Sequence, residues 1–80
     1  MTLEEAVVKR IFDLCNEHHI TVNKLSTICG ITQSTLNSIV NGQTKTTTVS
    51  TIKKICDGLN ITIVDFFNTD DFLNLEQEIK

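Results

Sequence analysis

The segment from residue 33 to residue 38 carries uncharged hydrogen-bonding side chains where a helix is expected. They are Gln33, Ser34, Thr35, Asn37 and Ser38. Gln and Asn amides can bond adenine edges through two atoms at once, and Ser and Thr hydroxyls can bond any base. An ordinary solvated helix face carries Glu and Lys, and neither occurs between Ile31 and Thr44. We interpret this face as one that contacts DNA bases rather than as a plain solvated face.

The residues before this face predict a short helix and a tight turn. Leu25, Ile28 and Cys29 fall on one face of that helix. Gly30 ends it, because glycine adopts a left-handed backbone at little steric cost. The stretch from Gly30 to Thr32 has the length and chemistry of a turn between two helices that cross at a large angle.

Thr32 is expected to cap a second helix, about residues 33–40, because its hydroxyl can accept from backbone N–H groups that lack a carbonyl partner. Leu36 and Ile39 point back at the first helix, and the polar side chains point away. Residues 21–41 therefore have the pattern of a helix-turn-helix, whose second helix enters a DNA major groove.

An amphipathic helix is predicted at the N-terminus, from about residue 3 to residue 17. Thr2 and Glu5 have the spacing of a capping box. The expected apolar face consists of Leu3, Val7, Val8, Ile11, Phe12, Leu14 and Cys15. His18 and His19 follow as a connector, because they lack further ligands at metal-binding spacing.

Two more helices are predicted beyond a polar, threonine-rich loop. Thr48 caps the first of them, about residues 49–59. Its expected apolar face consists of Val49, Ile52, Ile55, Cys56 and Leu59. Thr62, with Asp65 three residues later, starts a short fifth helix, and two phenylalanines close the core.

The net charge of −3 at first argues against a nucleic-acid partner. The charges are unevenly distributed, however. Residues 21–54 contain no acid and four lysines, Lys24, Lys45, Lys53 and Lys54, whereas six acids lie between residues 57 and 80. Four lysines make a weak basic patch. We expect modest affinity per subunit, strong salt dependence and a need for dimerisation.

The remaining chemistry points away from catalysis. Cys15, Cys29 and Cys56 occupy apolar helical positions without Cys-x-x-Cys spacing, which favours core thiols in a reducing compartment over a metal site. There is no nucleophile–base arrangement and no glycine-rich phosphate loop, so we expect neither an enzyme nor a cofactor. No membrane span or signal-peptide pattern occurs, so a cytoplasmic protein is expected.

Together these motifs resemble the Xre, or lambda-repressor-like, helix-turn-helix domains of phage and bacterial regulators, over about residues 3–68. The matching residues are Leu25, Ser26, Cys29-Gly30-Ile31, Thr32-Gln33, Leu36, Ile39, Asn41-Gly42, Leu59-Asn60-Ile61 and Asp65-Phe66-Phe67. The resemblance implies an all-α fold, a compact five-helix DNA-binding domain over residues 1–68. It also implies that Gln33 and Ser34 are the main base contacts, with Ser38 one turn further and Thr35 and Asn37 beside them.

A second group of residues is expected to contact DNA phosphates. It consists of Thr21, Asn23, Lys24, Thr32, Asn41, Thr44 and Lys45. Helix N-termini bind phosphate well, which favours the residues after Thr21. The family often has a phosphate-binding Gln where this chain has Val22, so Val22 is expected to pack on the core. Asn41 matches a phosphate-binding position of the family, and with Gly42 it is also a helix stop.

Residues 69–80 form an acidic tail with scattered apolar residues, Phe72, Leu73, Leu75 and Ile79. Thr69 or Asp70 can cap a short extra helix there. By resemblance, residues near or after the fifth helix serve dimerisation. We favour a contact with a second subunit slightly over packing on the same domain, with fraying as a third alternative.

The function that these expectations favour is sequence-specific, DNA-binding transcription regulation, with repression favoured over activation. A homodimer would place residues 33–40 of each subunit in successive major grooves of a palindromic operator, about 34 Å apart. The alternative is an antitoxin or another protein-interaction module on the same fold, whose DNA binding is weak or autoregulatory. A regulatory protein partner is compatible with both.

Overall fold

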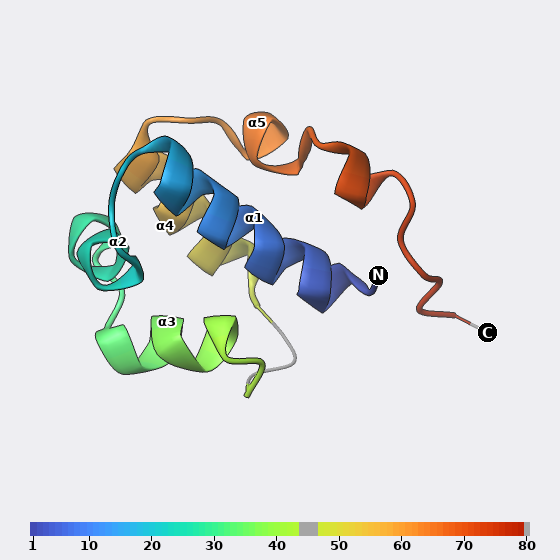
Figure 1. Ribbon diagram of the computed structural model, residues 1–80, viewed down its shortest axis with the longest axis horizontal. Helices are drawn as coiled ribbons and strands as arrows, with labels where there is room; N and C mark the ends of the chain where they lie inside the picture. Colours follow the sequence, from blue (N-terminus) through green and yellow to red (C-terminus); the bar gives the residue numbers. More distant parts are fainter. Residues whose placement is uncertain (44–46, 80) are drawn as a thin grey trace.

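Helices follow one another along residues 1–43 and 47–79, the part of the chain that the computed structural model describes (Figure 1). They are α1 (Leu3–Glu17), α2 (Val22–Cys29), α3 (Gln33–Val40), α4 (Val49–Leu59), α5 (Ile63–Phe67) and a 3-10 turn, η1 (Asp70–Phe72). No strand occurs in the described residues. The predicted all-α, five-helix fold is confirmed.

A threonine caps the N-terminus of each of the five α-helices. The caps are Thr2, Thr21, Thr32, Thr48 and Thr62, and each hydroxyl accepts from the backbone N–H three residues later. At α1 and α5 the carboxylate of the third helical residue, Glu5 or Asp65, accepts in turn from the backbone N–H of the threonine, which completes a capping box. The predicted helix starts are therefore confirmed, because each depended on a local hydrogen bond.

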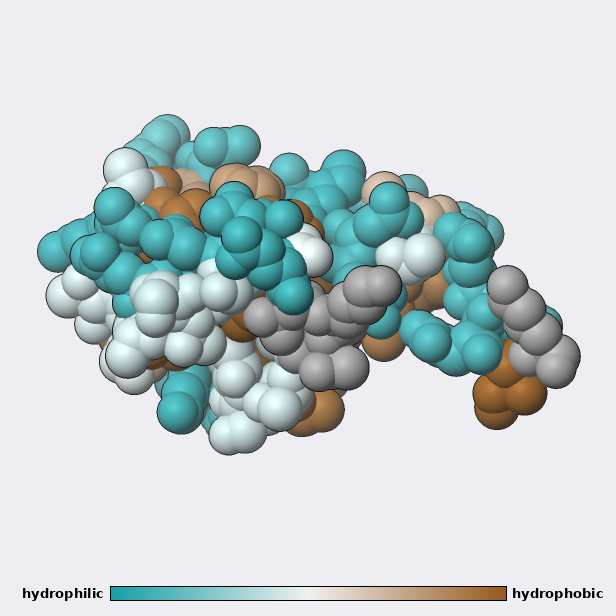
Figure 2. Space-filling view, turned by 90° about the horizontal axis from the view of Figure 1, so that it is seen from below, coloured by the Kyte–Doolittle hydropathy of each residue, from teal (hydrophilic) through white to brown (hydrophobic). Residues whose placement is uncertain are grey.

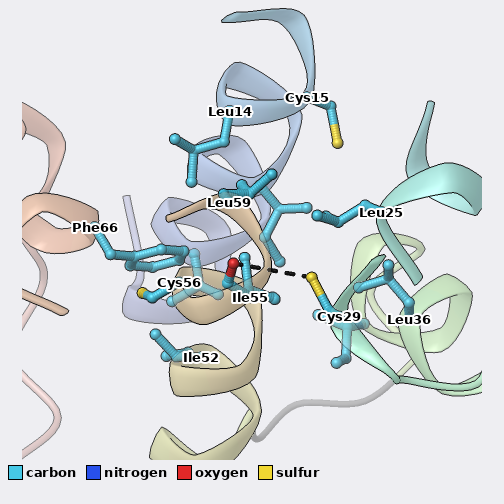
Figure 3. Packing of buried hydrophobic residues seen from close by; sticks show 13 residues of the cluster. Leu14, Cys15, Leu25, Cys29, Leu36, Ile52, Ile55, Cys56, Leu59 and Phe66 are labelled. Carbon is cyan, nitrogen blue, oxygen red and sulfur yellow. Dashed lines mark hydrogen bonds between the residues drawn. The ribbon is translucent and has the colours of Figure 1, made fainter. Parts of the chain in front are cut away.

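The hydrophobic core lies between α1, α4 and the helix-turn-helix formed by α2 and α3. Figure 3 shows Phe66 pointing from α5 toward α4, while Leu25 and Leu36 approach α4 from the other side. These three side chains are fully buried. Burial of such side chains stabilises the fold by roughly 1.5–3 kcal/mol each. The fifth helix thus closes the core, as the sequence predicted.

Four residues assigned to apolar helix faces are not buried. They are Leu3, Phe12, Ile28 and Val49, which are between 38% and 65% exposed. Two small side chains are buried instead, since Ala6 and Ser26 are at most 2% exposed. Helical periodicity gives the direction of a buried face, but the neighbouring helices decide how wide that face is. These four residues belong to the expected apolar faces but not to the buried core.

Helices α2 and α4 cross closely at Gly58. A β-carbon at this position would lie 2.7 Å from Cys29 Sγ and 3.2 Å from Cys29 Cα. Nearby, Cys29 Sγ lies 3.8 Å from the carbonyl oxygen of Ile55, to which the thiol donates (Figure 3). Glycine lowers the stability of a helix interior. Its presence at position 58 is explained by the packing, because a side chain there would clash with Cys29 of α2.

The acidic tail lies along α1 and passes close to the N-terminus (Figure 1). The carboxylate of Asp71 accepts from Lys9 at 2.9 Å, and the backbone N–H of Glu76 donates to the carbonyl of Met1 at 3.1 Å. The ring of Phe72 packs edge-on against Phe67, 4.9 Å between centroids. This part of the tail packs on its own domain, which was the second of the alternatives.

The extra helix expected in the tail is only the single 3-10 turn η1. Thr69 precedes it and makes no capping hydrogen bond. Leu73 and Ile79 remain 79% and 87% exposed. A short turn held by Phe72 replaces the expected capped helix, because Leu73, Leu75 and Ile79 do not form a common buried face.

Replacing Gly58 with Ala is expected to lower the free energy of unfolding by up to about 2 kcal/mol. Overpacking a core costs about 1–3 kcal/mol, of which roughly 1 is offset by the better helix propensity of Ala. Chemical denaturation followed by circular dichroism measures the change. Ser50→Ala, at an exposed position of the same helix, is the control and should be neutral or slightly stabilising. A Gly58→Ala protein that is more stable than its parent would contradict the close crossing, because the better helix propensity of Ala would then meet no packing cost.

Candidate nucleic-acid interface

Helix α3 lies on the outside of the molecule with one apolar face turned inward. Leu36 and Ile39 are buried beneath it. Of the five predicted base contacts, Gln33, Ser34 and Thr35 are exposed and Asn37 and Ser38 are half-buried. Figure 2, which looks from the side on which α3 lies, shows mainly hydrophilic and near-neutral residues there. All five side chains therefore belong to one solvent-facing helix.

The turn between α2 and α3 fixes the direction of α3. Gly30 adopts the left-handed conformation, with φ of 69°. The backbone N–H of Ile31 then donates to the carbonyl of Ser26 at 3.0 Å, and Thr32 caps the next helix. Ser26 itself is buried, and its hydroxyl donates to the carbonyl of Asn23 at 2.7 Å. The predicted stop and cap are confirmed, and together they form the corner of the helix-turn-helix.

The start of α2 presents the first set of predicted phosphate contacts. The hydroxyl oxygen of Thr21 accepts from the backbone N–H of Lys24 at 3.0 Å. Asn23 and Lys24 are exposed, whereas Val22 is half-buried against the core. Val22 therefore packs inward, as expected from its departure from the family pattern. The N-terminal end of α2 and its exposed residues remain open to an anion.

The end of α3 is shaped by Gly42 rather than by Asn41. Gly42 is left-handed, with φ of 74°, while Asn41 has a φ of −88° and stays exposed. The backbone N–H of Gln43 donates to the carbonyl of Ser38 at 2.9 Å, which ends the helix. The helix-stop interpretation is confirmed. The predicted phosphate contacts Thr44 and Lys45 lie outside the described residues.

A shallow pocket of about 330 Å³ lies between α3 and the start of α4. Its lining is rich in hydroxyl groups and consists of Ser34, Thr35, Ser38, Ile39, Thr47, Thr48 and Thr51. Thr47 and Thr51 were not among the predicted site residues. The signal for Thr47 in the sequence was the run of threonines before α4, whereas Thr51 lies within α4 and only the fold brings that helix beside α3. The polar surface is therefore wider than α3 alone.

Several of the positive charges are already paired within the domain. Lys9 contacts the carboxylates of Asp13 and Asp71 at 2.9 Å each, which raises the pKa of its ammonium group. Lys53 pairs with Asp57, and this pairing raises the pKa of Lys53 in the same direction. Local charge is thereby neutralised at both lysines. The lysine at the start of α2, Lys24, has no ion pair among the described residues.

Arg10 is used inside the fold rather than as a solvated charge. Its Nε donates to the carbonyl of Phe66 at 2.7 Å, and its Nη2 donates to the carbonyl of Asp65 at 2.9 Å. Its side chain is only 12% exposed. These carbonyls belong to the last turn of α5, where cations are favoured by the helix dipole. Arg10 therefore joins α1 to α5, which is 55 residues away along the chain and close only in the fold.

The thiols and carboxylates show no arrangement suited to metal chemistry in the described part of the chain. All three cysteines are free and buried. Burial raises the pKa of the Cys29 thiol to about 11, and it raises the pKa of Cys15 and Cys56 as well. These thiols are therefore protonated and weakly nucleophilic at neutral pH. They fill the core, as the sequence predicted.

The geometry of α2, its glycine turn and α3 defines a helix-turn-helix, the class of fold to which the sequence pattern pointed. The profile of the Cro/C1-type HTH DNA-binding domain matches residues 10–71. The chain belongs to this family of DNA-binding domains. The predicted resemblance to phage and bacterial helix-turn-helix regulators is confirmed.

A solved structure supports the same conclusion. The crystal structure of the prophage Lp1 protein 11 is similar to this chain, with 32% sequence identity and a TM-score of 0.82. The similarity covers 94% of this chain and 99% of the other. A search of curated proteins gave no match. Among the described residues, no helix has the length and apolar character needed to cross a membrane.

Replacing Arg10 with Met should destabilise the protein far more than replacing its neighbour Lys9 with Met. Hydrogen bonds to charged groups contribute about 1.5–3 kcal/mol, and Arg10 donates two of them to α5. Lys9 makes exposed ion pairs, which contribute at most about 1 kcal/mol. Thermal and chemical unfolding of both variants measures the difference. Equal losses would show that Arg10 does not hold α5 in solution.

Proposed function

We propose that the protein is a sequence-specific transcription regulator, and a repressor, that inserts α3 into the DNA major groove. The observation that carries this proposal is the outward face of α3, which presents five uncharged hydrogen-bonding side chains on a helix-turn-helix. Amides and hydroxyls of this kind match the donors and acceptors on base edges. Gln33 and Ser34, at the start of the helix, are the main base contacts. Thr35, Asn37 and Ser38 complete the contact surface.

Phosphate contacts position this helix on the duplex without selecting a sequence. We assign them to Thr21, Asn23 and Lys24 at the start of α2 and to Asn41 after α3, with Thr44 and Lys45 from the sequence pattern alone. The Thr21 hydroxyl accepts from a backbone N–H, so its own proton can be donated to a phosphate oxygen. Thr32 at the start of α3 was also expected in this group, but its hydroxyl donates to Thr35 Oγ1 at 2.7 Å and has no second proton for a phosphate.

A homodimer is part of the proposal because one subunit offers a small contact surface. Helix α3 has 8 residues, which span about 12 Å, and this is enough for only a few base pairs. Two subunits related by a two-fold axis would place their α3 helices one helical turn apart, about 34 Å, on a palindromic site. The similarity to a prophage protein agrees with a regulator of this kind. A protein partner that controls the dimer is compatible with the exposed apolar side chains of the tail, Leu73 and Ile79.

The direct test is selection of bound sequences from a random duplex pool, at low and at physiological salt. The proposal expects enrichment of a palindrome whose half-sites are about one helical turn apart. Analytical ultracentrifugation with the selected duplex should give two subunits per site. Binding without sequence preference that disappears as salt rises would refute the proposal and favour a protein-interaction module.

Replacing Gln33 with Ala should lower affinity for the selected site by about 1–3 kcal/mol and relax the preference at one base position. The reason is the loss of an amide that bonds one base through two atoms. Fluorescence anisotropy with single-base variants of the site measures both effects. Unchanged preference in the Gln33→Ala protein would contradict the assigned register of α3.

Replacing Lys24 with Gln should weaken binding to all sequences by a similar factor. It should also reduce the slope of log affinity against log salt by about 1, because one phosphate contact is lost. Lys53→Gln is the matched control, since it removes the same charge from a lysine that already pairs with Asp57. If both variants change the salt slope equally, net charge and not a phosphate contact at Lys24 is responsible.

A further inference from the structure

The hydroxyl groups of Thr32 and Thr35 form a directed pair at the start of α3. Thr32 Oγ1 accepts from the backbone N–H of Thr35 at 3.3 Å, as a helix cap does. The same oxygen donates its proton to Thr35 Oγ1, at 2.7 Å. A hydroxyl has a single proton to donate, so the proton of Thr32 is committed to Thr35.

This pair gives the Thr35 hydroxyl a preferred direction. Its oxygen accepts from Thr32, so its own proton is left for another partner. Hydrogen bonds in a chain polarise one another, which makes Thr35 a stronger donor and a poorer acceptor. The N-terminus of α3 is also the positive end of its dipole, and this field favours the oxygen inward and the proton outward.

The contact also fixes where the hydroxyl lies. Thr35 is exposed and borders the pocket between α3 and α4, yet its oxygen is held by a neighbour of its own helix. A free threonine hydroxyl at the surface rotates to suit either a donor or an acceptor. Thr35 is restrained in position and in polarity before any partner binds.

We propose that Thr35 is a specificity-determining residue of the DNA interface, donating to thymine or guanine, and that Thr32 is the positioning residue that sets its polarity. In the major groove, thymine and guanine present acceptors without an amino group, cytosine presents an amino donor alone, and adenine presents an amino donor beside its N7 acceptor. A donating hydroxyl therefore favours the first two. This inference rests on the proposed function, because it needs α3 in the major groove.

A similar pair on α4 shows that the arrangement at α3 is particular. Thr48 caps α4 and its hydroxyl lies 3.0 Å from that of Thr51, but either oxygen can be the donor there. The polarity of Thr51 is therefore not set by its cap. The two helices can be compared directly by experiment. In each, the N-cap is a threonine and a second threonine follows three residues later.

The experiment is selection from a random duplex pool with the wild-type protein and four variants, after circular dichroism melting shows each to be folded. Wild type and Thr35→Ser keep the hydroxyl and should select thymine or guanine at one position of each half-site. Thr35→Val has nearly the same shape without the hydroxyl and should lose about two- to tenfold of that preference, while the other positions are unaffected.

Thr32→Asp changes the polarity of the pair. A carboxylate still caps α3, but it has no proton, so it accepts from Thr35 and turns the lone pairs of Thr35 outward. The preference at the same position should move to adenine or cytosine. Thr48→Asp adds the same charge at the equivalent cap of α4 and should lower affinity for all sequences without altering any preference.

Three results would overturn the inference while leaving the proposed function intact. One is a Thr35→Val protein with every preference unchanged. Another is a Thr35→Val protein weakened equally on all sequences, which would place the hydroxyl on a phosphate. The third is a Thr32→Asp protein that keeps the wild-type base. If the wild-type protein selects no sequence at all, the proposed function fails and this inference fails with it.

Discussion

The close crossing of α2 and α4 at Gly58 is the contact on which the arrangement of the helix-turn-helix depends. Because no β-carbon separates the two helices there, α2 lies directly against the backbone of α4. Gly30 then turns the chain by a fixed angle into α3. Leu25 and Leu36, both fully buried, hold the two helices against the rest of the core. The outward direction of Gln33 and its neighbours follows from these packed contacts and not from α3 alone.

The domain uses much of its positive charge to hold itself together. Arg10 bonds the last carbonyls of α5, and Lys9 joins α1 to the tail through Asp71. The surface around α3 is correspondingly made of amides and hydroxyls, whose bonds depend on direction and distance more than on net charge. A negatively charged chain can therefore present a face suited to DNA, because specificity in the major groove depends on hydrogen-bond geometry.

Threonine serves two purposes in this chain. Its hydroxyl caps all five α-helices, and it recurs on the surface between α3 and α4. Thr32 does both, since it caps α3 and also donates a hydrogen bond to the hydroxyl of the exposed Thr35. Local folding signals and the polarity of the contact surface are thus set by the same side chain.

The sequence by itself determined the helices, their caps and the turn at Gly30. These features depend on residues three or four positions apart, whose hydrogen bonds form within one turn of backbone, and the bounds of α1, α3 and α4 agree with the predicted ranges. The candidate base contacts on α3 followed from the same periodicity. Only the tertiary structure decided that Gly58 accommodates α2, that Arg10 holds α5, that Phe12 and Val49 face solvent, and that the tail lies along α1. Each of these depends on the distance between helices that are far apart in the chain, and a pattern of side chains along one helix does not contain that distance.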